Sequence, residues 1–119
     1  MRPSTSTEVP DVSVPGFRVI LKMHIHPGME EEFEKVWHSV GAAVTDHPAN
    51  LGHWLMRSTN EDGVYYISSD WVNEQLFREF EESWEHGEHR ALLHPYRESA
   101  TIWTMHVVGH LPKTAEEVA

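Results

Sequence analysis

Two residues that could take part in chemistry, Trp71 and His89, stand at opposite ends of one segment of the chain. An apolar run typical of a β-strand ends at Trp71, a helical pattern follows at once, and His89 comes about five helical turns later. A large flat ring can form a wall of an apolar pocket, and an imidazole with an ordinary pKa of about 6.5 can exchange a proton near neutral pH. The spacing predicts a pocket that combines an aromatic wall with a base. The alternative for His89 is an exposed position near a helix end, where it would interact only with the helix dipole.

Alternating or apolar runs predict the strands that must position these residues, and apolar residues spaced by three and four predict the helices. The expected strands cover residues 17–25, 51–59, 64–71 and 100–108. The first helix is expected over residues 29–45, and the second is expected to start near Asn73, a suitable N-cap. Gly87 is expected to break or bend this second helix, so that a shorter helical piece runs over residues 88–93.

The resulting order, β-α-β-β-α-β, predicts an α+β fold of the ferredoxin-like type, a four-stranded antiparallel sheet with both helices on one face. Several strands are apolar on both alternations, as Ile20 beside Val19 and Leu21 illustrates, so the other face of the sheet also needs a cover. A second copy of the chain would supply one, which predicts a homodimer. One domain is expected over residues 16–110, with a disordered tail at 1–15 and a second tail at 111–119.

Composition narrows the class of partner. The formal net charge is −10, which disfavours nucleic acid and anionic membranes as partners. No apolar run reaches the length of about 18 residues that a membrane-spanning helix needs. The chain has no cysteine, which excludes disulfides and thiolate metal sites and fits a cytoplasmic location.

Several segments together resemble the antibiotic biosynthesis monooxygenase family of the dimeric α+β barrel superfamily. They are Pro27-Gly28 before the first helix, Phe33 and Trp37 within it, the strands at 55–58 and 65–71, and the helical run 88–92. The resemblance implies a pocket between the helices and the sheet. It also implies a small oxygenase that oxidises a polycyclic aromatic phenol or anthrone derived from a polyketide, using O2 for hydroxylation, quinone formation or ring cleavage. Such enzymes often have no bound cofactor, although some related ring-opening enzymes draw on reduced flavin from a partner reductase.

The chain departs from its relatives at three polar positions. Quinone-forming relatives have an asparagine four residues before the matching tryptophan, where this chain has Ile67. Heme-degrading relatives have an asparagine and an iron-binding histidine at positions that fall near Leu21 and Leu93, which disfavours heme degradation. Histidines must then supply the polar chemistry, and His89 is the first candidate.

The predicted catalytic residues are His89, Trp71, Arg57 and His53, of which His53 and Arg57 share a strand face and could together hold a phenolate. The predicted substrate-binding residues are Trp37, Tyr65, Ile67, Phe80, Trp84 and Leu93. For each aromatic residue the alternative is a place in the core, and for Arg57 it is a surface ion pair.

Two alternatives remain open at the level of function. His24 with His26, and His86 with His89, could each supply two ligands to a metal, but no third ligand is evident from the sequence, so no metal site is predicted. The fold would also suit a polyketide cyclase or isomerase that consumes no O2, or a ligand-binding protein. Uptake of O2 with a model phenol, with and without reduced flavin, separates these functions.

Overall fold

The structure is a computed structural model that describes residues 14–113, with the side chains of residues 84–86 outside the description. Most of the two predicted tails, residues 1–15 and 111–119, therefore lies outside the described residues. Within them the order of elements is β-α-β-β-α-α-β, with a short 3₁₀ turn before the last strand. The elements are β1 (Phe17–Ile25), α1 (Glu30–Thr45), β2 (Asn50–Arg57), β3 (Val64–Trp71), α2 (Glu74–Glu81), α3 (Trp84–Leu93), the 3₁₀ turn (His94–Tyr96) and β4 (Arg97–His106).

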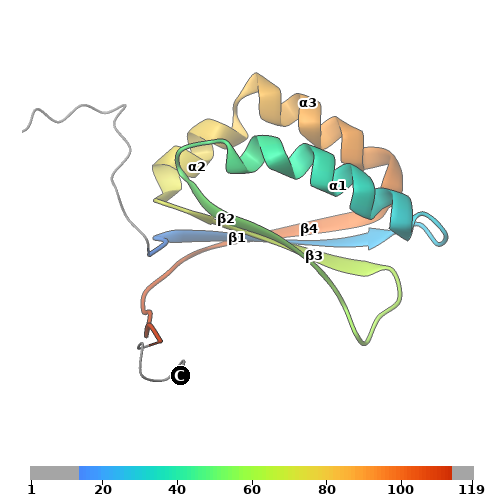
Figure 1. Cartoon of the computed structure of the whole chain (residues 1–119), viewed down its shortest axis with the longest axis horizontal. Coiled ribbons are helices and arrows are strands. Elements are labelled where there is room, and N and C mark those ends of the chain that lie inside the picture. The colour runs from blue at the N-terminus through green and yellow to red at the C-terminus, as the bar shows by residue number, and fades with distance from the viewer. Residues whose placement is uncertain (1–13, 114–119) are drawn as a thin grey trace, which may run out of the picture.

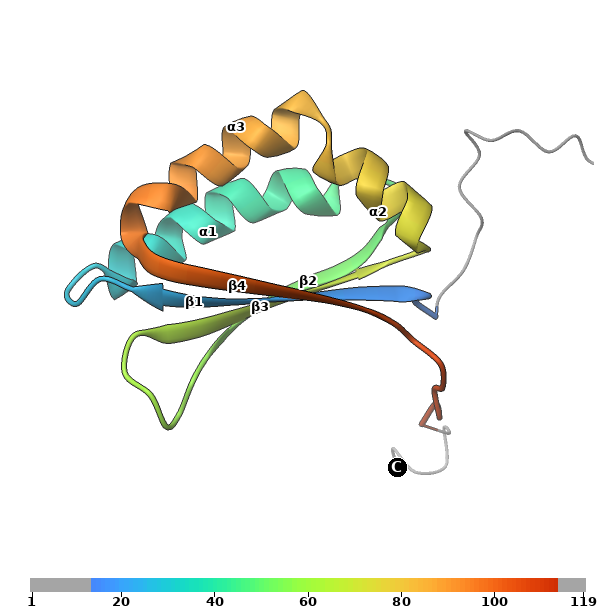
Figure 2. The ribbon, with the colours of Figure 1, turned by 180° about the vertical axis from the view of Figure 1, so that it is seen from behind.

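The four strands form one antiparallel sheet in the order β2-β3-β1-β4. The three helices of residues 14–113 lie on the same face of this sheet, and no helix of this part of the chain covers the other face (Figures 1 and 2). The predicted α+β fold, a four-stranded antiparallel sheet with its helices on one face, is confirmed. No helix in residues 14–113 is long and apolar enough to span a membrane.

The register of the strands decides which side chains meet under the helices. Leu21 pairs with Ile67 on one side and Ile102 on the other, and this row faces the helices. Ile20, one residue earlier, pairs with Ser68 and Trp103, and because side chains alternate along a strand this row belongs to the open face. Odd-numbered residues of β1 and β3 therefore build the floor of any space below the helices.

The second helical region differs from the prediction in where it is interrupted. The expected break at Gly87 is wrong, because α3 runs through this residue from position 84 to Leu93. The interruption comes earlier, at Glu82 and Ser83, after α2 has begun at its predicted N-cap. The Asn73 side chain accepts a hydrogen bond from the backbone N–H of Leu76 at 2.9 Å, which stabilises that start. A single exposed glycine costs a helix only about 1 kcal/mol, so the helix tolerates it.

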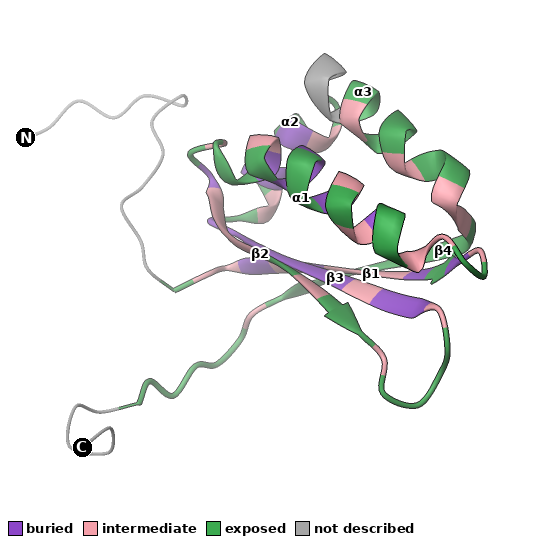
Figure 3. Cartoon of the chain, turned by 45° about the vertical axis from the view of Figure 1, so that its right-hand side comes forward, coloured by how far each residue is buried: buried purple, intermediate pink, exposed green. Residues whose placement is uncertain are grey.

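The apolar core between the helices and the sheet is divided into two clusters. One surrounds Trp71 and includes Phe17, Phe77 and Phe80, at the end of the sheet where α2 packs. The other surrounds Phe33 and consists of Met23, Ile25, Trp37, Tyr65 and Ile67. Figure 3 shows the buried residues of the sheet on the two central strands, β1 and β3, and further buried residues on α1 and α2. The helices are thus held to the sheet at two places, with space between them.

The open face of the sheet carries large apolar side chains in contact with solvent. Trp54, Met56, Trp103 and Met105 are all more than 40% exposed. In the same face Arg18 donates two hydrogen bonds to the buried carboxylate of Asp70, at 2.6 and 2.8 Å. This ion pair raises the pKa of Arg18, chiefly through the hydrogen bond. The predicted homodimer would cover this face, and it stays a prediction.

Candidate active site

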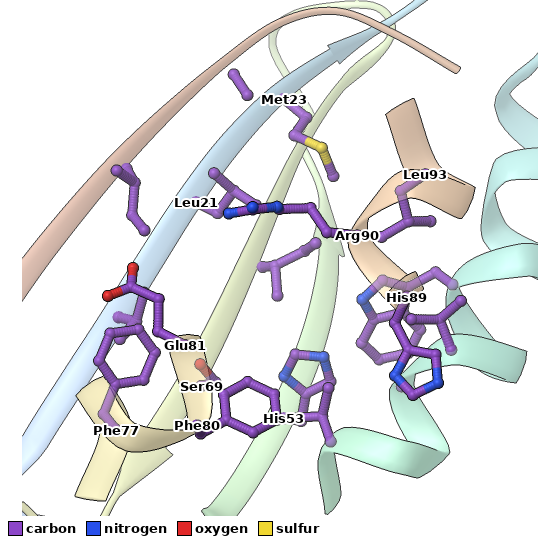
Figure 4. A pocket seen from close by; sticks show the side chains of 18 of the residues that line it. Leu21, Met23, His53, Ser69, Phe77, Phe80, Glu81, His89, Arg90 and Leu93 are labelled. Atoms are coloured by element: carbon purple, nitrogen blue, oxygen red, sulfur yellow. The ribbon is translucent and has the colours of Figure 1, made fainter. Parts of the chain in front are cut away.

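A cavity of about 390 Å³ lies between the two core clusters, bounded by the sheet and the three helices and partly open to solvent (Figure 4). Val19, Leu21 and Met23 of β1 form the middle of its floor, with Ile67, Ser69 and Trp71 of β3 beside them. The walls and rim come from α1, α2 and α3, from His53 of β2 and from the start of β4. Most of the lining is apolar, so the few polar groups that reach it stand out as candidates for chemistry.

Trp71 forms one end of the cavity and is held in place on all sides. Its side chain is only 1% exposed, and its ring packs against Phe77 and Phe80 with centroids 5.3 and 4.8 Å away. The indole N–H donates a hydrogen bond to Oγ of Ser69 at 3.0 Å. Trp71 can therefore present an aromatic surface to a ligand, while its polar atom is already engaged.

Ser69 is the buried polar group nearest to this wall. It lies two residues before Trp71, on the same face of β3, and is 6% exposed. Its oxygen accepts from Trp71, and no acceptor for its own hydroxyl proton is found among the described residues. A hydroxyl that accepts with its oxygen still has one proton to donate. Ser69 can thus offer a hydrogen bond to an oxygen atom of a ligand in the cavity.

His53 reaches the cavity through a stack with Trp37. The two rings are 5.1 Å apart and inclined by 16°, and both line the cavity. Gly41 of α1 makes this stack fit, because a Cβ atom there would lie 3.3 Å from Cδ2 of His53. One imidazole is therefore placed against a flat aromatic wall, at the side of the cavity where α1 meets β2.

The rim of the cavity near α3 carries most of its positive charge. His89, Arg90 and Leu93 line it from α3, and His94 and Arg97 follow in the chain. Arg97 donates a hydrogen bond to Nε2 of His94. In Figure 4 the Arg90 side chain extends from α3 over the pocket toward β1, and His89 lies on the α3 side. This rim combines bases that can accept a proton with two permanent positive charges.

A second, more open hollow lies on the other side of the Trp37–His53 stack. Glu34, Arg57 and Tyr65 line it. The Tyr65 hydroxyl donates to Glu34 Oε2 at 2.5 Å, and Arg57 lies 3.7 Å from the same oxygen. Burial raises the pKa of Tyr65 to about 12, and the hydrogen bond to Glu34 adds to this effect. The tyrosine therefore stays neutral at physiological pH, and the carboxylate of Glu34 holds both residues in this hollow.

Residues 16–92 match the sequence profile of the antibiotic biosynthesis monooxygenase family. The chain belongs to this family. The predicted resemblance is therefore confirmed, and it extends over every element from β1 to most of α3. A comparison with curated protein sequences found no match.

Several solved structures share the fold of this chain. SnoaB of Streptomyces nogalater, described as a cofactor-independent oxygenase, has a TM-score of 0.73 and 20% sequence identity, covering 84% of this chain and 100% of SnoaB. A candidate antibiotic biosynthesis monooxygenase of Caulobacter crescentus CB15 has a TM-score of 0.72 and 23% identity, covering 80% and 92% of the two chains. A conserved protein of Methanosarcina mazei Go1 has a TM-score of 0.70 and 16% sequence identity, covering 78% of this chain and 93% of that protein. At these identities the likeness establishes the fold alone.

Most of the residues predicted for the site do meet in the cavity. Its lining includes the predicted residues His89, Trp71, His53, Trp37, Ile67, Phe80 and Leu93. Arg57 and Tyr65 line the second hollow instead of the main cavity. His53 lines both spaces, so it shares the second hollow with Arg57. The side chain of Trp84 lies outside the described residues.

Sequence reasoning missed several polar residues of the lining, namely Ser69, Glu81, Arg90, His94 and Arg97. Ser69 could have been found, because strand alternation places it on the same face as Ile67 and Trp71. Arg90 and Arg97 carried no such signal, because the assumed break at Gly87 left the direction of α3 undefined.

The histidine pairs considered as metal ligands do not build a larger ligand set. His24 and His26 both approach the carboxylate of Glu98, with Nδ1–oxygen distances of 3.9 and 3.5 Å. Across the described residues, no group of three or more histidine, aspartate or glutamate side chains is placed to hold a metal ion. His86 lies among the side chains that are not described.

Proposed function

We propose that the protein is an oxygenase that uses O2 to oxidise a polycyclic aromatic phenol or anthrone, derived from a polyketide, in the formation of an antibiotic or other secondary metabolite. The observation that carries this proposal is the apolar cavity under the helices, with its aromatic walls and the imidazoles of His53, His89 and His94 in its lining. Its volume of about 390 Å³ lies within the range of small-molecule sites, about 300–1,000 Å³. Flat walls such as Trp37 and Trp71 favour a flat ligand, because stacked rings bury large apolar surfaces.

The proposed reaction begins with loss of a proton from the substrate to an imidazole, and His89 is the first candidate for this base. An anthrone that loses a proton from its CH2 carbon becomes an electron-rich anion, which can give one electron to O2. The two radicals combine to form a C–O bond, and the resulting hydroperoxide loses water as the second C–H proton leaves. The CH2 group and O2 thus become a ketone and water, and no further reductant is consumed.

The protein would assist by binding the anion and by excluding water. Ser69 stands two residues after Ile67 on the same strand face, so its hydroxyl can hold the substrate oxygen that an asparagine would otherwise bind. An apolar enclosure strengthens such a hydrogen bond, because little solvent competes for it. Aromatic hydroxylation would in addition consume two electrons, which reduced flavin from a partner reductase could supply. A cyclase or isomerase would need the same base but would leave O2 unconsumed.

The test is O2 uptake by the purified protein with an anthrone such as dithranol, measured with an oxygen electrode with and without reduced flavin. We expect uptake to match the substrate consumed, and His89→Gln to lower turnover at least about tenfold, which corresponds to about 1.4 kcal/mol of barrier. His110→Gln is the matched control, since His110 is exposed and does not line the cavity. Conversion of substrate without O2 uptake would favour the cyclase or isomerase. Unchanged turnover in His89→Gln would exclude His89 as the base.

A further inference from the structure

The two arginines at the cavity rim, Arg90 and Arg97, lack the carboxylate partner that five other described lysines and arginines have. Arg18, Lys22, Lys35, Arg57 and Arg78 each form an ion pair with an aspartate or glutamate. Among the described residues no carboxylate lies within ion-pair distance of Arg90 or Arg97. Arg97 donates a hydrogen bond to His94, but no described carboxylate balances the charge of either arginine, so both guanidinium groups can bind an anion beside the apolar cavity.

No acidic side chain in the described lining of the cavity neutralises the charges of Arg90 and Arg97. Glu81 is the acidic residue in the described lining, and its carboxylate is bound by Arg78 at 3.1 Å, on the side of α2. The pairing raises the pKa of Arg78, first through its hydrogen bond to Glu81, so Arg78 stays charged beside this carboxylate. The rim formed by Arg90 and Arg97 therefore has an excess of positive charge, in a chain whose net charge is −10.

From this arrangement we propose that Arg90 and Arg97 form an anion subsite at the mouth of the cavity, which binds the carboxylate of an aromatic acid whose rings fill the apolar interior. The inference rests on the proposed function, because it assigns the polar end of the same substrate. A chain of net charge −10 repels anions at long range, so an anionic substrate requires a local excess of positive charge. A substrate without a negative charge would leave both guanidinium groups unmatched.

The chemistry of the rim favours a carboxylate over a phosphate. A guanidinium fork matches the two oxygens of a carboxylate with parallel hydrogen bonds. The helix end beside this rim is the C-terminal end of α3, whose dipole disfavours an anion in proportion to its charge and so a doubly charged one more than a carboxylate. Phosphate sites in proteins commonly use the opposite, N-terminal end of a helix. The rim is thus suited to a single negative charge carried on two oxygens.

The test compares anthraquinone-2-carboxylate with its neutral carboxamide by isothermal titration calorimetry, at low ionic strength and about pH 8, where unperturbed imidazoles are neutral. We expect the wild-type protein to bind the carboxylate at least about tenfold more tightly, as charge-assisted hydrogen bonds predict. Arg90→Gln should remove most of this preference while binding the carboxamide as before, and Arg90→Lys should keep part of it. Arg97→Gln should also reduce the preference.

Lys35→Gln is the matched control, since it removes one positive charge from the outer side of α1 and should leave the preference intact. Arg90 also lies in the last turn of α3, where a cation stabilises the helix through its dipole. If that were its only role, Arg90→Gln would lower the melting temperature without changing the preference, and the subsite would be refuted. Equal affinities for both ligands in the wild-type protein would refute the subsite and leave the proposed function standing. Failure to bind either ligand would refute both.

Discussion

At the scale of single residues, Glu34 holds two polar side chains, Tyr65 and Arg57, outside the main cavity. Its carboxylate accepts the hydroxyl of Tyr65 and lies 3.7 Å from the guanidinium of Arg57. Both residues lie on strand faces that point toward the helices, as His53 and Ile67 do. Glu34 of α1 nevertheless binds them on the far side of the Trp37–His53 stack. A residue on the correct face is therefore not always a residue of the site.

The hydrogen bond between Tyr65 and Glu34 predicts a change of stability at alkaline pH. The pKa of Tyr65 is raised from 10.0 to about 12 in the folded protein, so folding favours its neutral form. The stabilisation this provides is complete below pH 10 and is lost as the pH rises from about 10 to 12. We expect the difference in free energy of unfolding between wild type and Tyr65→Phe to shrink over this interval, as measured by denaturant titration. A difference that stays constant across it would contradict the assignment.

Part of the site could be predicted from the sequence, because strand alternation and family resemblance each place some residues near the cavity. Strand alternation places Ile67 and Trp71 on one face, and the family resemblance places His89 and Leu93 near it, without any three-dimensional information. The exclusion of Arg57 depends on Glu34, a residue on another element, which no local pattern relates to it. The inclusion of Arg90 depends on the direction of α3. Contacts between distant elements are thus the part of the site that sequence patterns leave open.

At the scale of elements, α3 shows how a glycine can mislead a helix prediction. Gly87 is exposed inside the helix, and a Cβ atom added there would meet nothing within 4 Å. The strands and α1 were predictable because each has a strong apolar period. The apolar period of the helix around Gly87 is weak. The low helix propensity of this single glycine therefore led to the prediction of a break.

Replacing Gly87 by alanine tests whether α3 is continuous. Because alanine favours the helix and the position is open, Gly87→Ala should raise the free energy of unfolding by about 0.5–1 kcal/mol, measured by urea denaturation. Gly41→Ala in α1 provides the comparison, because its Cβ atom would lie 3.3 Å from Cδ2 of His53, a contact that offsets the gain. A loss of stability in Gly87→Ala would show that the helix does not continue through this residue.

At the scale of the whole molecule, the open face of the sheet predicts self-association. Trp103 on this face is 45% exposed, and large apolar groups gathered on one face usually mark an interface. We expect a dimer in size-exclusion chromatography with light scattering, and a shift toward monomer in Trp103→Glu. Ile102→Glu is the matched control, because Ile102 is 51% exposed on the same strand but faces the helices. A wild-type monomer at micromolar concentration would refute the dimer.

The two faces of the sheet also separate four of the five tryptophans into two groups with different exposure to water, and the side chain of Trp84 lies outside the described residues. Trp37 and Trp71 line the cavity and are at most 8% exposed, whereas Trp54 and Trp103 on the open face are 48% and 45% exposed. Indoles shielded from water emit at shorter wavelengths than hydrated ones. The filling of the cavity would therefore alter the short-wavelength part of the emission, and the covering of the open face would alter the long-wavelength part. One spectrum of the unlabelled protein can follow both events separately.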